Sequence, residues 1–146
     1  MDANANQERD QRSRLCALAT FNERETLPGV VNAIFAAVPD AHILGVYDNA
    51  PDGTGTWCEG RATDEPRLTC IHRSGKLGLG TATVAAIRHA IEHGYSHLAT
   101  LDADGSHDPA ELPALFDAAQ TADVAIGSRS CVGGQIAGWP WSRRVV

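Results

Sequence analysis

The sequence is poor in aromatic residues, has no excess of positive charge and contains no long apolar run. Aromatic residues make up 5% of the 146 residues, and the formal net charge is −6 at pH 7. A nucleic-acid-binding domain needs a basic face, and one that binds single strands usually adds aromatic rings for stacking. No stretch approaches the roughly 18 apolar residues that a membrane-spanning helix needs. The composition therefore argues against a nucleic-acid partner and against a transmembrane segment.

The N-terminus also lacks the apolar core of a secretory signal. Residues 1–14 read MDANANQERDQRSR and are polar almost throughout, so secretion is not expected. We expect these residues to form a disordered lead. The remaining residues, 15–146, are expected to form one domain in the cytoplasm, since their number suits a single hydrophobic core.

Closely spaced cysteines and the common phosphate-binding motifs are missing as well. The cysteines are Cys16, Cys58, Cys70 and Cys131. None of them forms a C-x-x-C pair, so we expect packed, reduced thiols. A P-loop would need a glycine at position 70, and no G-x-G-x-x-G follows the first predicted strand. The glycine-rich loop over 75–80 instead offers flexible backbone that can approach a phosphate or a sugar, with Lys76 as a nearby cation.

What the chain does contain is a regular alternation of short apolar runs and amphipathic segments. The apolar runs predict strands over 15–19, 42–47, 68–72, 97–101 and 123–127. Apolar residues at helical spacing predict helices over about 26–38, 54–62, 81–93 and 108–120. This alternation is typical of an α/β fold with a mostly parallel sheet and helices on both faces. Such sheets bind their ligands at the carboxyl ends of the strands.

Two carboxylates one residue apart follow the fourth predicted strand. Asp102 and Asp104 lie in the sequence LATLDADGSHDP, which covers 98–109. Residues i and i+2 of an extended segment lie on the same side, so both side chains can converge on one Mg²⁺ or Mn²⁺. Two solvated acids in a turn are the simpler interpretation. However, polar groups follow all five predicted strands, at 20–23, 48–52, 73–76, 102–104 and 129. That agreement favours a ligand site along one edge of the sheet.

The histidines divide into two groups. His89 and His93 share a helix face, but Gly94 ends that helix before His97. We therefore expect these three to be surface residues rather than metal ligands. His107 lies in the acidic loop, where it could either touch a ligand or close a turn.

Six motifs in a fixed order resemble those of glycosyltransferase family 2, which has the Rossmann-like GT-A fold. They are most similar to those of the polyprenyl (dolichol) phosphate mannosyltransferases. The motifs are A-T-F-N-E over 19–23, D-N-A-P-D-G-T over 48–54, K-L-G-L-G-T over 76–81, D-A-D-G-S-H-D-P over 102–109, G-S-R over 127–129, and G-G with W-P-W-S-R over 133–143. The resemblance implies an inverting transfer of mannose from GDP-mannose to a polyprenyl phosphate. It also implies a peripheral position at the cytoplasmic face of a membrane.

The resemblance assigns roles to individual residues. The base and ribose of the donor would bind Thr20, Phe21, Glu23 and Asp48. The donor's diphosphate would bind Lys76, Asp102 and Asp104. A Mg²⁺ or Mn²⁺ ion on the diphosphate would be held by Asp102, Asp104 and Ser106. Catalysis would rest on Asp104, Arg129 and Arg143, with the two arginines meeting the acceptor phosphate.

The chain departs from the family pattern at several positions and ends early. Ala19 stands where the family has proline, Tyr47 replaces the first acid of a pair, Ala50 replaces serine, and Gly105 replaces leucine. Family members continue well beyond the arginine motif, so residues 15–146 are expected to be the donor-binding part of a domain truncated at its C-terminus.

Three alternatives stay open. The first is a family 2 enzyme that uses UDP-glucose or another acceptor. The second is a nucleotide-sugar-binding relic without transfer activity, and the third is an unrelated doubly wound domain, against which the W-P-x-x-R tail argues.

Overall fold

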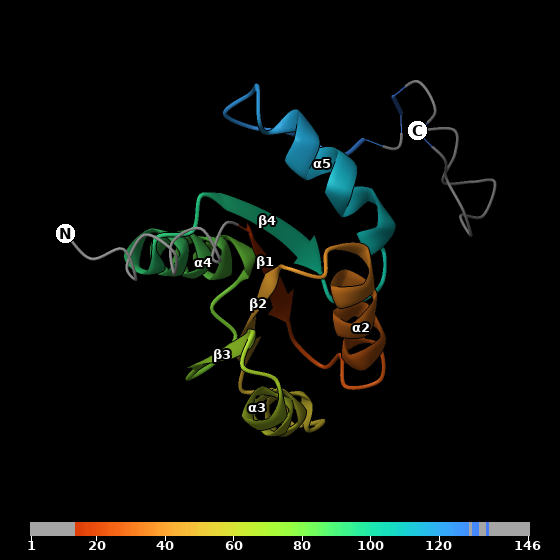
Figure 1. Ribbon diagram of the computed structural model, residues 1–146. Coiled ribbons are helices and arrows are strands. Elements are labelled where there is room, and N and C mark those ends of the chain that lie inside the picture. The colour runs from red at the N-terminus through yellow and green to blue at the C-terminus, as the bar shows by residue number, and fades with distance from the viewer. Residues whose placement is uncertain (1–13, 129, 132–133, 135–146) are drawn as a thin grey trace.

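The core of the molecule is a parallel four-stranded sheet with helices on both faces (Figure 1). The computed structural model describes residues 14–128, 130, 131 and 134. The strands, in the spatial order β3-β2-β1-β4, are β1 (Arg14–Thr20), β2 (His42–Asp48), β3 (Leu68–Arg73) and β4 (His97–Asp102). The helices are α2 (Leu27–Ala37), α3 (Thr54–Asp64), α4 (Leu79–His93) and α5 (Leu112–Ala118), the last preceded by the 3₁₀ turn η1 (Pro109–Glu111). Within these residues, no helix has the length and apolarity that crossing a bilayer requires.

The sequence-based elements agree with the structure within two residues at each end, apart from the fifth strand and the last helix, which was predicted from 108 but begins with the 3₁₀ turn η1, so that α5 itself starts at Leu112. Arg14 corrects the expected disordered lead, because it pairs with His97 as the first residue of β1. The rest of that lead, residues 1–13, lies outside the described residues.

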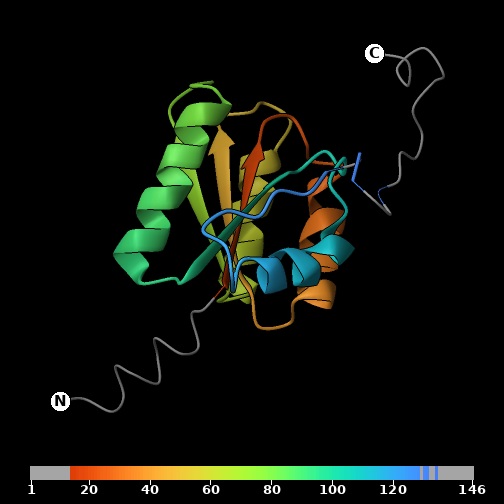
Figure 2. The same ribbon diagram turned by 90° about the horizontal axis from the view of Figure 1, so that it is seen from above.

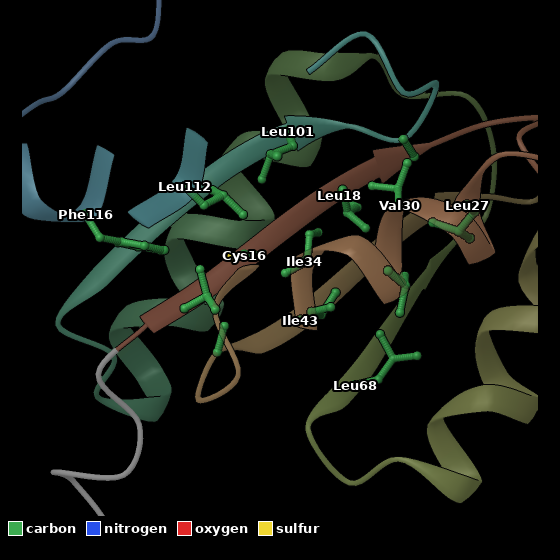
Figure 3. Packing of buried hydrophobic residues seen from close by; sticks show 14 residues of the cluster. Cys16, Leu18, Leu27, Val30, Ile34, Ile43, Leu68, Leu101, Leu112 and Phe116 are labelled. Carbon is green, nitrogen blue, oxygen red and sulfur yellow. The ribbon is translucent and has the colours of Figure 1, made fainter. Parts of the chain in front are cut away.

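Alternation along β1 directs its side chains to two separate cores. Cys16 and Leu18 face α2, α3 and α5, in a cluster that includes Ile34 and Ile43 (Figure 3). On the other face, Leu15 and Ala17 pack with residues of β2 against the alanines of α4, which are Ala82, Ala86 and Ala90. Figures 1 and 2 show α4 alone on its side of the sheet, with α2 and α5 on the opposite side.

The predicted fifth strand is wrong: residues 123–127 form no strand. Val124 and Ile126 are 71% and 82% exposed. The connections β1–β2 and β2–β3 run toward β3 with their helices on the α2 face. The connection from β3 to β4 runs in the opposite direction across the sheet, and its helix α4 covers the opposite face. All three crossover connections therefore have the same handedness. Since α5 packs on the α2 face, a parallel strand placed beyond β4 would need the opposite hand, which sheets almost never adopt.

The prediction of reduced cysteines is wrong for one pair. Cys58 of α3 and Cys70 of β3 form a disulfide with a Cα–Cα distance of 6.3 Å, within the usual range. Packing of α3 on the sheet brings them together, which spacing in the sequence does not reveal. Gly45 on β2 makes room for the bridge, because a Cβ atom there would lie 2.7 Å from Cys58 Sγ. Cys16 is a free thiol, and burial raises its pKa to about 12.

Candidate functional site

Polar side chains from all four strands meet at the carboxyl edge of the sheet. Because the strands are parallel and in register, Asp48 pairs with Arg73, and Ala19 pairs with Asp102. Thr20 ends β1 at the same level. The predicted gathering of polar residues at one edge is therefore confirmed for the first four strands. Arg129 and Arg143 lie outside the described residues.

The acidic loop after β4 is anchored through the residue between its two carboxylates. The side chain of Ala103 is fully buried, and its carbonyl accepts a 2.8 Å hydrogen bond from the Thr26 hydroxyl before α2. Gly105 has φ +79°, a left-handed conformation that suits glycine and turns the chain sharply. Asp102 and Asp104 flank the buried alanine, so both carboxylates stay outside the core. Their backbone positions are thus fixed by packing and by one cross-loop hydrogen bond.

Hydrogen bonds within the loop favour the charged form of Asp104. Its Oδ1 accepts a 2.8 Å hydrogen bond from the Ser106 backbone N–H. Hydrogen bonds from Ser106 lower the pKa of the Asp104 carboxyl. The carboxylate is thereby kept ionised, the form that a metal ion or a cationic group would require.

His107 closes the turn, one of the two roles left open by the sequence. Its Nδ1 accepts a 3.1 Å hydrogen bond from the Asp102 backbone N–H. Since Nδ1 is the acceptor, the ring proton belongs on Nε2. That atom lies 3.9 Å from Asp102 Oδ2. His107 therefore orients the first acid of the loop from its backbone and from its side chain.

Glu23 lies close enough to both acids to respond to their charge. Burial raises the pKa of its carboxyl, and the negative charges of Asp104 and Asp102 raise it further. Its Oε2 accepts a 3.3 Å hydrogen bond from the Phe21 backbone N–H. Thr20, the last residue of β1, has a buried hydroxyl that lies close enough to the Glu23 carboxyl to lower its pKa, although it makes no hydrogen bond of regular geometry with any residue that the structure describes. The end of β1 and the loop after it thus offer the site one hydroxyl and one carboxylate.

The Asp48 carboxylate is already bound by other groups of the protein. Its Oδ1 lies 2.5 Å from Arg73 Nε, and its Oδ2 accepts a 3.2 Å hydrogen bond from the Leu77 backbone N–H. Arg73 also donates a 2.6 Å hydrogen bond to the Thr81 hydroxyl at the start of α4. Asp48 and Arg73 together hold the glycine-rich loop against the sheet. The sequence had marked Arg73 only as one of several polar residues at a strand end.

Lys76 and Phe21 meet across the edge, although they come from different loops. The Lys76 ammonium lies 4.6 Å from the centre of the Phe21 ring, a distance typical of a cation–π contact. Both residues are in the predicted donor set. The contact brings a cation and an aromatic ring together beside the end of β1.

Asp52 and Thr54 organise the loops around the site. Asp52 accepts hydrogen bonds from the Arg24 backbone N–H, at 3.0 Å, and from the Thr54 hydroxyl, at 2.7 Å. The fully buried Thr54 hydroxyl oxygen in turn accepts a 3.1 Å hydrogen bond from the Glu23 backbone N–H. These bonds lower the pKa of Asp52. The site prediction did not include Thr54; only the turn sequence P-D-G-T indicated it.

The predicted metal ligands form an incomplete set. Within the described ranges, no group of three or more histidine, cysteine or acidic residues could hold a metal ion. Asp102 and Asp104 supply two hard oxygen donors, and the Asp102 side chain is 44% exposed. Such a pair fits Mg²⁺ or Mn²⁺ ions that take their other ligands from water and a diphosphate. Ser106 lies in the same loop, where its backbone N–H binds Asp104.

Comparison with known sequences gives a consistent result over nearly the whole chain. The family model described as Glycosyl transferase family 2 matches residues 16–145. An undecaprenyl-phosphate mannosyltransferase of Micrococcus luteus is 45% identical over 132 residues, which are 90% of this chain and 54% of that protein. A polyprenol monophosphomannose synthase of Mycolicibacterium smegmatis is 46% identical over 134 residues, which are 90% of this chain and 51% of that protein. The chain therefore spans about half the length of the curated relatives it matches.

A solved structure shares the fold. It is the mannosyltransferase PcManGT from Pyrobaculum calidifontis in complex with GDP-Man and Mn²⁺. The similarity has a TM-score of 0.53 at 21% identity and covers 62% of this chain and 27% of that one. This likeness supports the predicted GT-A architecture of the sheet and its helices.

Proposed function

Because the chain belongs to glycosyl transferase family 2, we propose that residues 15–146 form the donor-binding part of a mannosyltransferase. Its donor is GDP-mannose, and its acceptor is a polyprenyl phosphate at a membrane surface. The relatives from Micrococcus and Mycolicibacterium are named for mannosyl transfer to such lipids. The observation that carries the proposal is the position of Asp102 and Asp104 at the carboxyl edge of the sheet, beside the loop of Glu23, which Thr26 ties to Ala103 between the two acids.

The nucleoside of the donor binds along the ends of β1 and β2. Thr20 contributes its buried hydroxyl, and Phe21 contributes a ring that is already in contact with Lys76. Glu23 accepts hydrogen bonds from the donor. Asp48 acts together with Arg73, so the donor meets an ion pair and not an isolated carboxylate.

The diphosphate lies between Lys76 and the acidic loop. Asp102, Asp104 and Ser106 would hold a Mg²⁺ or Mn²⁺ ion, which would offset the negative charge of the diphosphate. Asp104 is suited to this role because its hydrogen bonds with Ser106 keep it ionised. Lys76, in the glycine-rich loop, provides a second positive charge. Positive charge placed beside the diphosphate stabilises the negative charge that develops on this leaving group.

The transfer itself is an in-line displacement. An oxygen of the acceptor phosphate attacks the anomeric carbon, the bond from that carbon to the diphosphate breaks, and GDP leaves with the electron pair, so the configuration inverts. A phosphate monoester has a second pKa of about 6 and is largely ionised at neutral pH, so no general base is required. Arg129 and Arg143 would bind the acceptor phosphate.

Isothermal titration of the chain with GDP-mannose tests the donor site. In the presence of Mn²⁺ we expect saturable binding that weakens at least tenfold in Asp102→Asn and in Asp104→Asn. Asp117→Asn, on the exposed side of α5, is the matched control and should bind like the parent chain. Equal binding with a chelator would contradict the metal assignment. Tighter binding of UDP-glucose would contradict the choice of donor.

A further inference from the structure

One face of β4 is left open by the helices. Leu101 is buried on the α2 side, whereas Thr100, on the opposite face, is exposed and Leu98 is only partly buried. Strands of a parallel sheet are normally covered on both faces. The buried alanines of α4 pack against Leu15, Ala17, Leu44 and Val46 of β1 and β2. A groove therefore runs between the β4 side of α4 and the open face of β4.

The wall of this groove is apolar. Ile87 and Ile91 stand one turn apart on α4 and are 43% and 74% exposed, and Leu79 at its start is 62% exposed. Thr83, one turn before Ile87, lines a cavity together with Thr100 of β4, so this flank of the helix faces the strand. A flank of a helix that faces only solvent normally carries polar side chains. On α4 the charged residues Arg88 and Glu92 lie on the other flank.

A cavity forms the upper end of the groove. It has a volume of about 200 Å³ and ends at Asp102 and His107 beside the acidic loop. Most of its lining consists of small side chains, such as Ala17, Ala19 and Ala82. A projecting aliphatic side chain can enter a space of this kind and bury apolar surface there.

Most of the large apolar side chains that are exposed among the described residues belong to α4 or to the loop before it. Seven large apolar side chains are markedly exposed, and all but Val124 and Ile126 belong to α4 or to the loop directly before it. Clustering of exposed aliphatic residues on one element is a usual mark of an interaction surface. The curated relatives contain about as much sequence again as this chain matches.

We propose that the groove between α4 and β4 is the docking surface for an amphipathic helix from the remaining half of a family 2 transferase. The helix covers Ile87 and Ile91 and places one aliphatic side chain in the cavity beside Asp102. A membrane is a poorer fit, since the polar flank of α4 carries one cation, Arg88, and one anion, Glu92, instead of several cations for anionic lipid. The proposal rests on family membership and not on the proposed reaction.

Thiol accessibility tests this proposal directly. Ile87→Cys and Arg88→Cys are prepared in the Cys131→Ser background, and their reaction rates with a charged maleimide are measured. They are compared in this chain and in a fusion of the full chain to the part of the Mycolicibacterium protein beyond its match. We expect both thiols to react rapidly in the chain alone. In the fusion, the thiol of Ile87→Cys should react at least tenfold more slowly, and that of Arg88→Cys less than twofold.

The same pair of substitutions at the aligned positions of the full-length Micrococcus protein provides a second reading that does not depend on folding of the fusion. Rapid reaction at the position aligned with Ile87 in that protein would overturn the proposal. So would protection of Ile87→Cys in this chain alone that rises with protein concentration, because the occupant would then be a second copy. Protection by phosphatidylglycerol vesicles would likewise identify a membrane as the occupant and overturn it.

Discussion

The carboxylate of Asp48 and the guanidinium of Arg73 form an ion pair at 2.5 Å, with side chains only 7% and 10% exposed. The pair joins the ends of two neighbouring strands, and Arg73 extends it to Thr81 at the start of α4. Asp48 also accepts a hydrogen bond from the Leu77 backbone N–H. The aspartate expected at the nucleotide is thus also the anchor of the glycine-rich loop, and its two roles cannot be separated by one substitution.

Arg73→Gln should lower the free energy of unfolding by about 3 kcal/mol, because removal of one partner leaves a buried carboxylate uncompensated. Urea denaturation of the chain measures this loss. Arg88→Gln, on the exposed side of α4, is the control and should change stability by less than about 0.5 kcal/mol. Asp48→Asn combined with Arg73→Gln should cost clearly less than the sum of the single changes; simple additivity would show that the two side chains do not stabilise each other.

Two glycine substitutions should have opposite effects. Gly45→Ala should destabilise the chain by about 1–3 kcal/mol, since its Cβ would meet Cys58 Sγ at 2.7 Å. Gly60 lies within α3 and has no atom within 4 Å of an added Cβ, so Gly60→Ala should stabilise by about 0.5–1 kcal/mol. Thermal unfolding followed by circular dichroism distinguishes them. Similar shifts for both variants would argue against close packing of the disulfide on β2.

Local patterns of the sequence were enough to predict the four strands, their helices and the edge at which polar residues gather. This succeeded because buried parallel strands are short apolar runs and because all their carboxyl ends share one edge. The position of Asp102 and Asp104 at this edge could be predicted for the same reason. The spacing of two acids around a buried Ala103 is a property of one extended segment, which requires no knowledge of distant parts of the chain.

The failures all depend on contacts between distant segments. Residues 123–127 have a strand-like pattern, but α5 packs on the face that gives a crossover of the wrong hand. Cys58 and Cys70 meet only after α3 docks on the sheet. The pairing of Asp48 with Arg73 likewise follows from strand order and register, since β2 and β3 must be neighbours. The spacing of apolar residues along the sequence contains no information on these contacts between distant segments.

Asp52→Ala should loosen the loop after β1 without removing any group of the donor site itself. The change breaks the hydrogen bonds that Asp52 accepts from the backbone N–H groups of Arg24 and Thr54, each at 3.0 Å, and from the Thr54 hydroxyl, and a lost hydrogen bond costs about 1 kcal/mol. Faster amide exchange at Arg24 and Thr54, measured by NMR, is the expected result. Asp64→Ala, at the end of α3, is the control. Unchanged exchange at both amides would mean that the loop is held by other contacts.

The ionisation of Glu23 should make the chain less stable as pH rises through the mildly acidic range. Its folded pKa is raised above the ordinary value of 4.5, first by burial and then by Asp104 and Asp102. Between the unfolded and folded pKa values the native state binds more protons, so the free energy of unfolding falls with rising pH. Glu23→Gln should remove this decline, whereas Glu25→Gln, which removes an exposed charge from the same loop, should retain it. Carbon-detected NMR titration of the Glu23 carboxyl adds a direct measurement: Asp104→Asn should lower its pKa, because a neighbouring negative charge is lost. If the pKa of Glu23 were insensitive to both Asp104→Asn and Asp102→Asn, the three carboxylates would not share one site.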